Sequence, residues 1–247
     1  MTDGPFSRVR YLVETASTNE DAAALLGTPE GAGLTIAAEH QTAGAGRKGR
    51  TWRSRPGASL LFTTILPEAI PATDIWAVPF WTALAVRAGL RELGVATDLH
   101  WPNDLLIGLR KVAGILCVSR VSGPYAFVAA GVGINVARHP EADGDISPPP
   151  AFCDDVAPIE RSELLAAILA EFGKTLPTLD APQRVARRWE EAAGLPGRRY
   201  RLLVDGEDAP FEANAIALAT GGALVVERDG ARRTIALADA RALRDPT

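Results

Sequence analysis

Short runs in which hydrophobic and polar residues alternate, or in which β-branched residues are concentrated, occupy much of the first half of the chain. Such runs are typical of β-strands. The first three cover residues 8–14, 34–40 and 59–66. Four more follow in close succession, with a hairpin turn expected near residues 108–110; they cover residues 97–101, 105–109, 111–120 and 125–136.

Helices are predicted where apolar residues recur at a spacing of three or four. The longest covers residues 74–93, and we expect it to bend near Pro79 because proline cannot donate a helical hydrogen bond. Ser17 and Glu20 have the spacing of a capping box, which predicts a short helix ending at Gly27. Two further helices are expected over residues 161–173 and 182–193.

Strands and helices do not alternate regularly along the chain, which favours an α+β fold with a mixed β-sheet flanked by helices. The composition changes at residues 194–197, after which short alternating runs are separated by turns that contain glycine. We therefore expect two domains, residues 1–194 and residues 195–247, the second a small β-barrel. Residues 138–158 are rich in Pro, Asp and Gly and predict a mobile loop.

Composition and charge exclude several functional classes. The chain has 247 residues and a formal net charge of −4, so it lacks the basic footprint of a non-specific nucleic-acid binder. No apolar run approaches the roughly 18 residues of a membrane-spanning helix, and the first residues lack a signal-peptide pattern. Cys117 and Cys153 lie far apart without a CxxC or paired histidines, which argues against a disulfide scaffold or a zinc site. We expect a cytoplasmic protein with no membrane association.

Lysine is rare in this chain. Of 26 basic residues only Lys48, Lys111 and Lys174 are lysines, a ratio that codon bias toward arginine explains. Lys111 begins a predicted strand that is otherwise apolar. Its compact ammonium could neutralise a carboxylate and a phosphate while the two react. A bulkier arginine would not be equivalent there, because the two cations are not interchangeable. An exposed lysine at a strand end is the alternative interpretation.

A loop of Gly, Arg and Lys, residues 41–58, lies between the second and third predicted strands. Its segment GAGRKGR, residues 44–50, matches the residue pattern of the dinucleotide fingerprint G-x-G-x-x-G but lacks the strand and helix that flank that fingerprint. Polar residues precede it, and Pro56 stands where a helix would have to follow. Glycines that admit a ligand close to the backbone, combined with three cations, suit a polyanion such as ATP or an acyl-adenylate. A solvated basic turn remains the alternative.

Three further motifs place polar groups at the ends of predicted elements. Residues 100–104 (HWPND) put an amide and a carboxylate at a strand end, where they could hold Mg²⁺ or accept a proton from an amine, although ordinary turn chemistry explains them too. Residues 131–135 (GVGIN) allow close backbone contact and end in an amide. Residues 17–19 (STN) could bind a neutral polar group, and a helix cap accounts only for the serine.

These motifs, with RK-x-AGIL at residues 110–116 and QTAG-x-G-R-x-G-R-x-W from Gln41, resemble in order and spacing the catalytic region of the biotin protein ligases. The C-terminal barrel is similar to that family's SH3-like domain. The resemblance implies a fold of the class II synthetase type and a reaction in two steps. Biotin and MgATP first form biotinyl-5′-adenylate and pyrophosphate. A lysine of a biotin carboxyl carrier protein then takes the biotinyl group and releases AMP. ATP and Mg²⁺ are thus the implied co-substrate and activator, with no tightly bound prosthetic group.

The resemblance also implies roles for single residues. Lys111 would touch the biotin carboxylate and the phosphate, Arg47 would retain the adenylate, and Asp104 would activate the incoming amine or hold Mg²⁺. The biotin site would be lined by Ser17, Thr18, Asn19, Gln41, Ala45, Gly46, Arg47 and Lys111. The nucleotide would be bound by Arg47, Lys48, Arg50, Trp52, Asn103 and Asn135.

The chain departs from the family pattern at two positions. Ala45 stands where the family usually has arginine, and His100 stands where it usually has lysine. Because Lys111, Arg47 and Asp104 are retained, we still expect an active enzyme.

The first predicted strand begins near residue 8, so the monofunctional type is expected, with no N-terminal helix-turn-helix and no DNA binding. The implied partner is the carrier protein of a biotin-dependent carboxylase, and a homodimer is left open. A lipoate or octanoate ligase of the same superfamily and a non-catalytic adenylate-binding relative are the alternatives.

Overall fold

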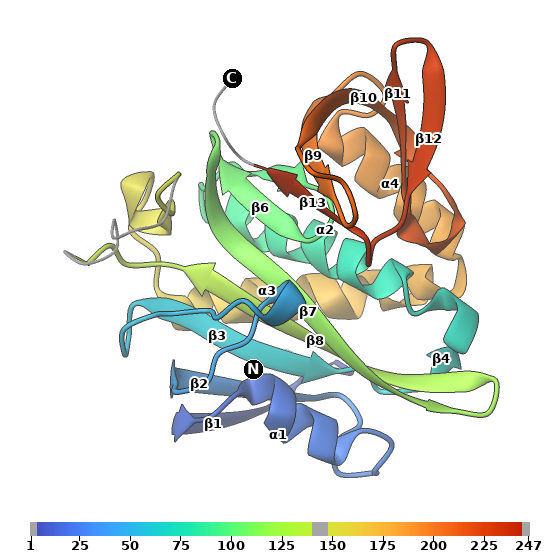
Figure 1. The fold of residues 1–247 in the computed structure, drawn as a ribbon. Coiled ribbons are helices and arrows are strands. Elements are labelled where there is room, and N and C mark those ends of the chain that lie inside the picture. Colours follow the sequence, from blue (N-terminus) through green and yellow to red (C-terminus); the bar gives the residue numbers. More distant parts are fainter. Residues whose placement is uncertain (1–3, 140–147, 244–247) are drawn as a thin grey trace.

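The computed structural model describes residues 4–139 and 148–243, which form two sheets flanked by helices (Figure 1). The larger sheet has the strand order β1-β2-β3-β8-β7-β6-β5, and β4 pairs with β8. β1 and β2 are parallel, whereas the other pairs are antiparallel, so the sheet is mixed as predicted. Its strands are β1 Arg8–Thr15, β2 Leu34–Gln41, β3 Ser59–Ile65, β4 Ile70–Pro71, β5 Asp98–His100, β6 Asp104–Ile107, β7 Arg110–Ser122 and β8 Tyr125–Asn135.

Helices cover both faces of this sheet. α1 (Thr18–Leu25) packs on one face, while α2 (Ala77–Glu92) and α3 (Arg161–Thr175) lie together on the other (Figure 1). The alternation along β2 explains the division, because successive strand residues point to opposite faces. Ile36 packs with Ala22 of α1, whereas its neighbour Ala37 belongs to the main core.

The smaller sheet is antiparallel, with the order β12-β11-β10-β9-β13. Its strands are β9 Arg199–Val204, β10 Phe211–Leu218, β11 Leu224–Arg228, β12 Ala231–Ile235 and β13 Ala240–Leu243, and α4 (Pro182–Ala193) precedes them. The buried Tyr200 and Leu224 share one hydrophobic core with Trp101 of the first region. The Trp101 indole N–H also donates to the Gly222 carbonyl oxygen at 3.1 Å. The domain division at residue 194 stays a prediction, and the two parts pack through a continuous core.

The predicted strands and helices are all present, but three local expectations are wrong. Ser17 precedes α1 without a capping hydrogen bond from its side chain, so no capping box forms. Pro79 lies in the first turn of α2, where its missing N–H costs no helical hydrogen bond. The helix begins at Ala77, so the place where a bend was expected is the first turn of the helix. Within the expected mobile loop, Ala151, Phe152 and Cys153 are buried, while residues 140–147 lie outside the described residues.

Among the described helices, none combines the length and the apolar character that a crossing of the lipid bilayer requires.

Candidate active site

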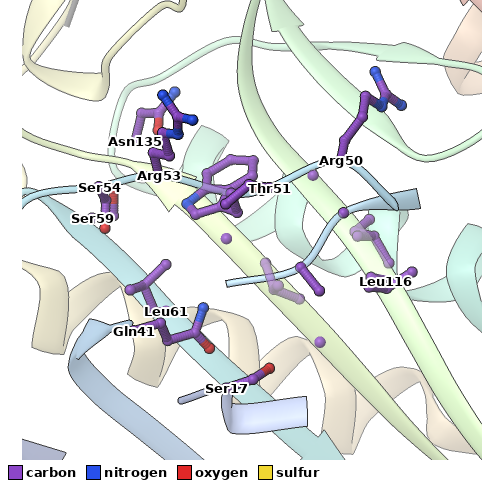
Figure 2. A pocket seen from close by; sticks show the side chains of 18 of the residues that line it. Ser17, Gln41, Arg50, Thr51, Arg53, Ser54, Ser59, Leu61, Leu116 and Asn135 are labelled. Carbon is purple, nitrogen blue, oxygen red and sulfur yellow. The ribbon is translucent and has the colours of Figure 1, made fainter. Parts of the chain in front are cut away.

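A cavity of about 790 Å³ lies between the first turn of α1, the loop of residues 44–50 (the glycine loop) and the β7–β8 pair (Figure 2). Its middle is lined by apolar side chains of the sheet, including Leu61 and Val132. Polar side chains gather at its two ends, and the cations Lys111, Arg47 and Arg50 line the wall between them. A cavity of this size, mostly apolar with a few convergent polar groups, has the character of a small-molecule site.

One end, here called the amide end, is formed by Ser17, Thr18, Asn19 and Gln41. The Thr18 backbone N–H and hydroxyl both donate to Gln41 Oε1, at 2.8 and 2.9 Å. This fixes the amide so that its nitrogen faces the open cavity, as Figure 2 shows. The amide end therefore presents oriented neutral donors and acceptors rather than charges.

Thr63 of β3 completes the amide end, and sequence reasoning missed it. Its hydroxyl donates to Asn19 Oδ1 at 2.8 Å and lies 2.8 Å from the Thr18 hydroxyl. Asn19 in turn donates to the Leu116 carbonyl oxygen at 3.0 Å. Thr63 is fully buried within β3, and no local motif in the sequence marks it.

Lys111 lies at the middle of the cavity wall, at the start of β7. Its ammonium is 2.6 Å from Asp104 Oδ1 and 5.3 Å from the centre of a Trp52 ring. The two charged side chains are only 18% and 10% exposed. Asp104 itself faces a separate small cleft of about 20 Å³, which Arg47, Lys48 and Arg50 also line. The ion pair thus stands between the large cavity and the small cleft.

Trp52 lies flat against β7 and β8 because two glycines leave room for its indole. A Cβ atom at Gly133 would lie 2.8 Å from the Trp52 ring, and one at Gly114 would lie 3.1 Å from it. The Trp52 backbone N–H donates to the Gly44 carbonyl oxygen at 2.8 Å, which ties the ring to the glycine loop. Trp52 therefore packs beneath the loop and forms part of the cavity wall.

The glycine loop is closed on itself and rests against the second sheet. Gly46 N–H donates to the Arg50 carbonyl oxygen at 2.7 Å. Arg47 donates to Asn103 Oδ1 at 3.4 Å and to the Leu237 carbonyl oxygen. Burial lowers the pKa of the Arg47 guanidinium, since a charge removed from water is less favoured until an anion pairs with it.

Lys48 does not line the large cavity, although it was predicted to bind the nucleotide. Its ammonium lies 2.7 Å from both carboxylate oxygens of Asp205, in the turn after β9. Its backbone has φ 55°, a left-handed conformation that is uncommon for a residue with a side chain. The second sheet therefore holds the tip of the glycine loop through an ion pair that joins residues far apart in the sequence.

The opposite end of the cavity, here called the aromatic end, is lined by Arg53, Asn135, His139, Pro150 and Phe152. The Asn135 amide nitrogen donates to the Ala151 carbonyl oxygen at 3.1 Å, and the His139 and Phe152 rings meet edge to face at 5.9 Å. A guanidinium, an amide and an aromatic wall suit a flat heterocycle joined to phosphates.

The predicted site residues fall into two groups. The eight residues assigned to biotin all line the large cavity, as do Arg50, Trp52, Asn103 and Asn135 of those assigned to the nucleotide. Lys48 and Asp104 face only the small cleft. Within the part of the chain that the structure describes, no three His, Cys, Asp or Glu side chains gather in a way that could hold a metal ion. The donors around Asp104 therefore do not fit a metal site built by the protein alone.

Comparison with known proteins gives a consistent result. The family described as "Biotin/lipoate A/B protein ligase family" matches residues 13–135. A Mycobacterium tuberculosis protein named biotin–[acetyl-CoA-carboxylase] ligase is 32% identical over 89% of this chain and 86% of its own length. A Paracoccus denitrificans protein of the same name is 37% identical over 68% of this chain and 73% of its own. An Aquifex aeolicus biotin protein ligase, solved with biotin and ATP, shares the fold with a TM-score of 0.77, at 23% identity, over 97% of this chain and all of that one.

Proposed function

The chain belongs to the biotin/lipoate A/B protein ligase family, and we propose that the cavity beneath its glycine loop is where biotin is activated. The enzyme is a biotin ligase: it joins biotin to the AMP moiety of ATP and then transfers the biotinyl group to a biotin carboxyl carrier protein. Biotin and ATP are its substrates. The residue roles that follow are our proposal for how this chain performs that reaction.

The observation that carries the proposal is the position of Lys111. In the first step a biotin carboxylate oxygen forms a bond to the α-phosphorus of ATP, and pyrophosphate leaves. Two anions must meet, and Coulomb repulsion opposes their approach. The Lys111 ammonium lies on the cavity wall between the amide end and the aromatic end, so it can contact both anions at their junction. Asp104 holds that ammonium in place at 2.6 Å.

The two ends of the cavity suit the two substrates. The amide end offers fixed neutral hydrogen-bonding groups, which match the ureido ring of biotin, and the neighbouring apolar side chains match its aliphatic chain. The aromatic end, with its guanidinium and ring faces, matches adenine and phosphates. Arg47 and Arg50 of the glycine loop line the wall between, where the phosphates of ATP would lie.

The second step needs a proton acceptor near the attacking amine of the carrier lysine. That amine bonds to the biotinyl carbonyl carbon, the bond to the phosphate oxygen breaks, and AMP leaves. The Asp104 carboxylate faces the small cleft beside the reaction centre, and we assign to it the proton that the amine loses. Mg²⁺ would be bound mainly by the ATP phosphates, and the residues that the structure describes hold no cluster of three ligating side chains for it.

The partner is proposed to be the carrier protein of a biotin-dependent carboxylase, and the place of reaction the cytoplasm. An assay with purified protein, MgATP, labelled biotin and an apo carrier domain tests the function. Label on the carrier is expected. Label from lipoate or octanoate instead would support the alternative ligase, and bound adenylate without transfer would support the non-catalytic relative.

Lys111→Ala tests the assigned chemistry. Adenylate formation should fall by a factor of about 10³, in the range of other lost groups that stabilise transition-state charge, because the two reacting anions lose their shared cation. Biotin binding should remain measurable. Lys174→Ala is the matched control, since Lys174 is an exposed lysine paired with Glu171 on α3. An active wild type with unchanged adenylation in Lys111→Ala would show that the role given to Lys111 is wrong.

A further inference from the structure

The wall of the aromatic end is formed by a segment that belongs to neither sheet. Residues 150–155 contain no strand and only one short 3₁₀ helix, Cys153–Asp155. Pro150 and Phe152 nevertheless line the cavity. Because no strand ladder fixes this segment, its position depends on a small number of individual contacts.

Backbone contacts attach the segment to the ends of two strands. Ala151 N–H donates to the Lys111 carbonyl oxygen at 2.9 Å, and Asp154 N–H donates to the Val136 carbonyl oxygen at 3.1 Å. The segment therefore touches the backbone of the residue whose side chain lies at the reaction centre.

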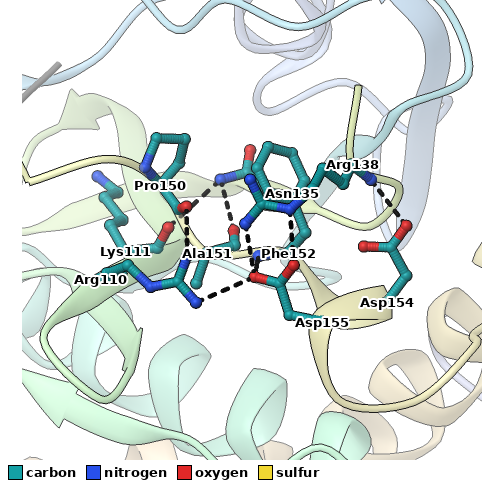
Figure 3. A network of polar contacts seen from close by, with 9 residues as sticks. All are labelled: Arg110, Lys111, Asn135, Arg138, Pro150, Ala151, Phe152, Asp154 and Asp155. Carbon is teal, nitrogen blue, oxygen red and sulfur yellow. Dashed lines mark hydrogen bonds and ion pairs between the residues drawn. The ribbon is translucent and has the colours of Figure 1, made fainter. Parts of the chain in front are cut away.

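The Asp155 carboxylate joins three pieces of chain (Figure 3). Its Oδ1 accepts from Arg138 Nε at 2.8 Å. Its Oδ2 accepts from Arg138 at 2.9 Å, from Arg110 at 3.2 Å and from the Phe152 backbone N–H at 3.1 Å. Charge-assisted and bidentate hydrogen bonds of this kind are the strong ones, and they also fix orientation.

Both arginines that Asp155 binds also contact residues of the cavity wall. Arg110 directly precedes Lys111 and donates to the Pro150 carbonyl oxygen at 3.4 Å. The Arg138 guanidinium lies over the Phe152 ring at 4.9 Å. Asp155 thus sets both the position of Phe152 and the orientation of the guanidinium that packs on it.

We infer that Asp155 is a positioning residue for the nucleotide: through Arg110 and Arg138 it holds Pro150 and Phe152 in place as the wall of the aromatic end. Asp155 does not line the cavity and acts only through these neighbours. The inference rests on the proposed function, since it takes the aromatic end to be the nucleotide end. The role of Asp155 could not be predicted from the sequence, because Asp155 lies in a Pro- and Asp-rich stretch outside every motif.

Asp155→Asn tests the inference, because asparagine keeps the shape and removes the charge that holds two guanidinium groups. Pyrophosphate release is measured while ATP and biotin are varied separately. The KM for ATP should rise about tenfold, while the KM for biotin and the midpoint of thermal unfolding stay close to those of the wild type. Asp154→Asn is the matched control: Asp154 accepts only the Arg138 backbone N–H among the contacts drawn here, and asparagine can still accept it.

An unchanged KM for ATP in Asp155→Asn, with an active wild type, would overturn the inference. A parallel rise in both KM values would also overturn it, since that would mark a general loss of structure. If Asp155→Asn does not fold, Arg110→Lys decides by the same criterion, because lysine lacks the two guanidinium nitrogens that contact Pro150 and Asp155 separately. A wild type without biotin ligase activity would instead count against the proposed function.

Discussion

The two ends of the cavity are built in different ways. The amide end stands on regular elements, with Thr18 on α1, Gln41 on β2 and Thr63 on β3, and neutral hydrogen bonds join them. The aromatic end and the glycine loop consist of irregular segments that ion pairs hold in place. Asp155 forms the ion pairs of the aromatic end, and Asp205 forms that of the glycine loop.

This difference has a consequence for how the site responds to change. Buried neutral hydrogen bonds in a sheet scaffold are unaffected by salt but tolerate little change in shape. Ion pairs between loops are weakened by salt, and the more exposed of the two here, Lys48–Asp205, contributes little by itself. Such pairs can break and form again as a ligand enters. We therefore expect biotin binding to depend on fixed geometry, and nucleotide retention to depend on charge.

The largest effect is expected at Gly131, because Asn19 occupies the space that a side chain there would fill. A Cβ atom there would lie 2.1 Å from Asn19 Oδ1 and 2.7 Å from the Leu116 carbonyl oxygen. In Gly131→Ala the catalytic efficiency for biotin should fall about 100-fold, a difference of about 2.7 kcal/mol. Steady-state kinetics with varied biotin measure it, and Gly173→Ala is the control, since a Cβ there makes only ordinary contacts. A normal KM for biotin in Gly131→Ala would show that the amide end is more adaptable than the structure indicates.

Thr63→Val gives a smaller and more specific effect at the same end. Valine keeps the size but removes the hydroxyl, so Asn19 Oδ1 loses its donor. Leaving a buried polar group unpaired costs about 1–3 kcal/mol, which predicts a rise of roughly tenfold in the KM for biotin with the KM for ATP unchanged. Added salt should not alter the defect.

Thr64→Val separates this effect from a loss of stability. Thr64 follows Thr63 on β3, is equally buried, and its hydroxyl pairs with that of Thr35 at 2.9 Å, away from the cavity. It should lower the midpoint of unfolding without raising the KM for biotin. Equal KM changes in the two variants would contradict the specific role of Thr63.

The residues of the amide end were named from the sequence through the resemblance to a family, and such a resemblance can be recognised because its motifs are local. Residues 17–19 and Gln41 belong to short motifs next to predicted strands, and the sheet brings those strands together. Thr63 could not be found in this way, because its role depends on which face of β3 it occupies. A change of one residue in register would have pointed its hydroxyl at the opposite face.

The ion pairs that hold the glycine loop and the aromatic end could not be predicted, because they join segments that no local sequence pattern relates. Lys48 and Asp205 are 157 residues apart. Asp155 meets Arg110 and Arg138 only after β7, β8 and the segment after them are in place. The sequence showed a basic loop that suits an anion, yet one of its cations is already paired with a carboxylate of the second sheet.

Asp205→Asn tests the charge-dependent side of the comparison and should have the smallest effect. The Lys48–Asp205 pair is partly exposed, with the Asp205 side chain 63% accessible, and such pairs are worth at most about 1 kcal/mol. Without it the glycine loop is held to the second sheet by the Arg47 contact with Leu237 alone among the contacts described above. The KM for ATP should therefore rise about two- to fivefold at low salt, with the KM for biotin unchanged. At high salt the Lys48–Asp205 pair of the wild type should be screened, so the KM values for ATP of the two proteins should become equal.

Asp208→Asn is the control, because it removes a neighbouring exposed carboxylate for which no contact with the loop is described. Its KM for ATP should equal that of the wild type at both salt concentrations. A rise in Asp205→Asn that persists at high salt would mean that the loop depends on the shape of the Asp205 turn rather than on its charge, and the contrast between the two ends would then fail.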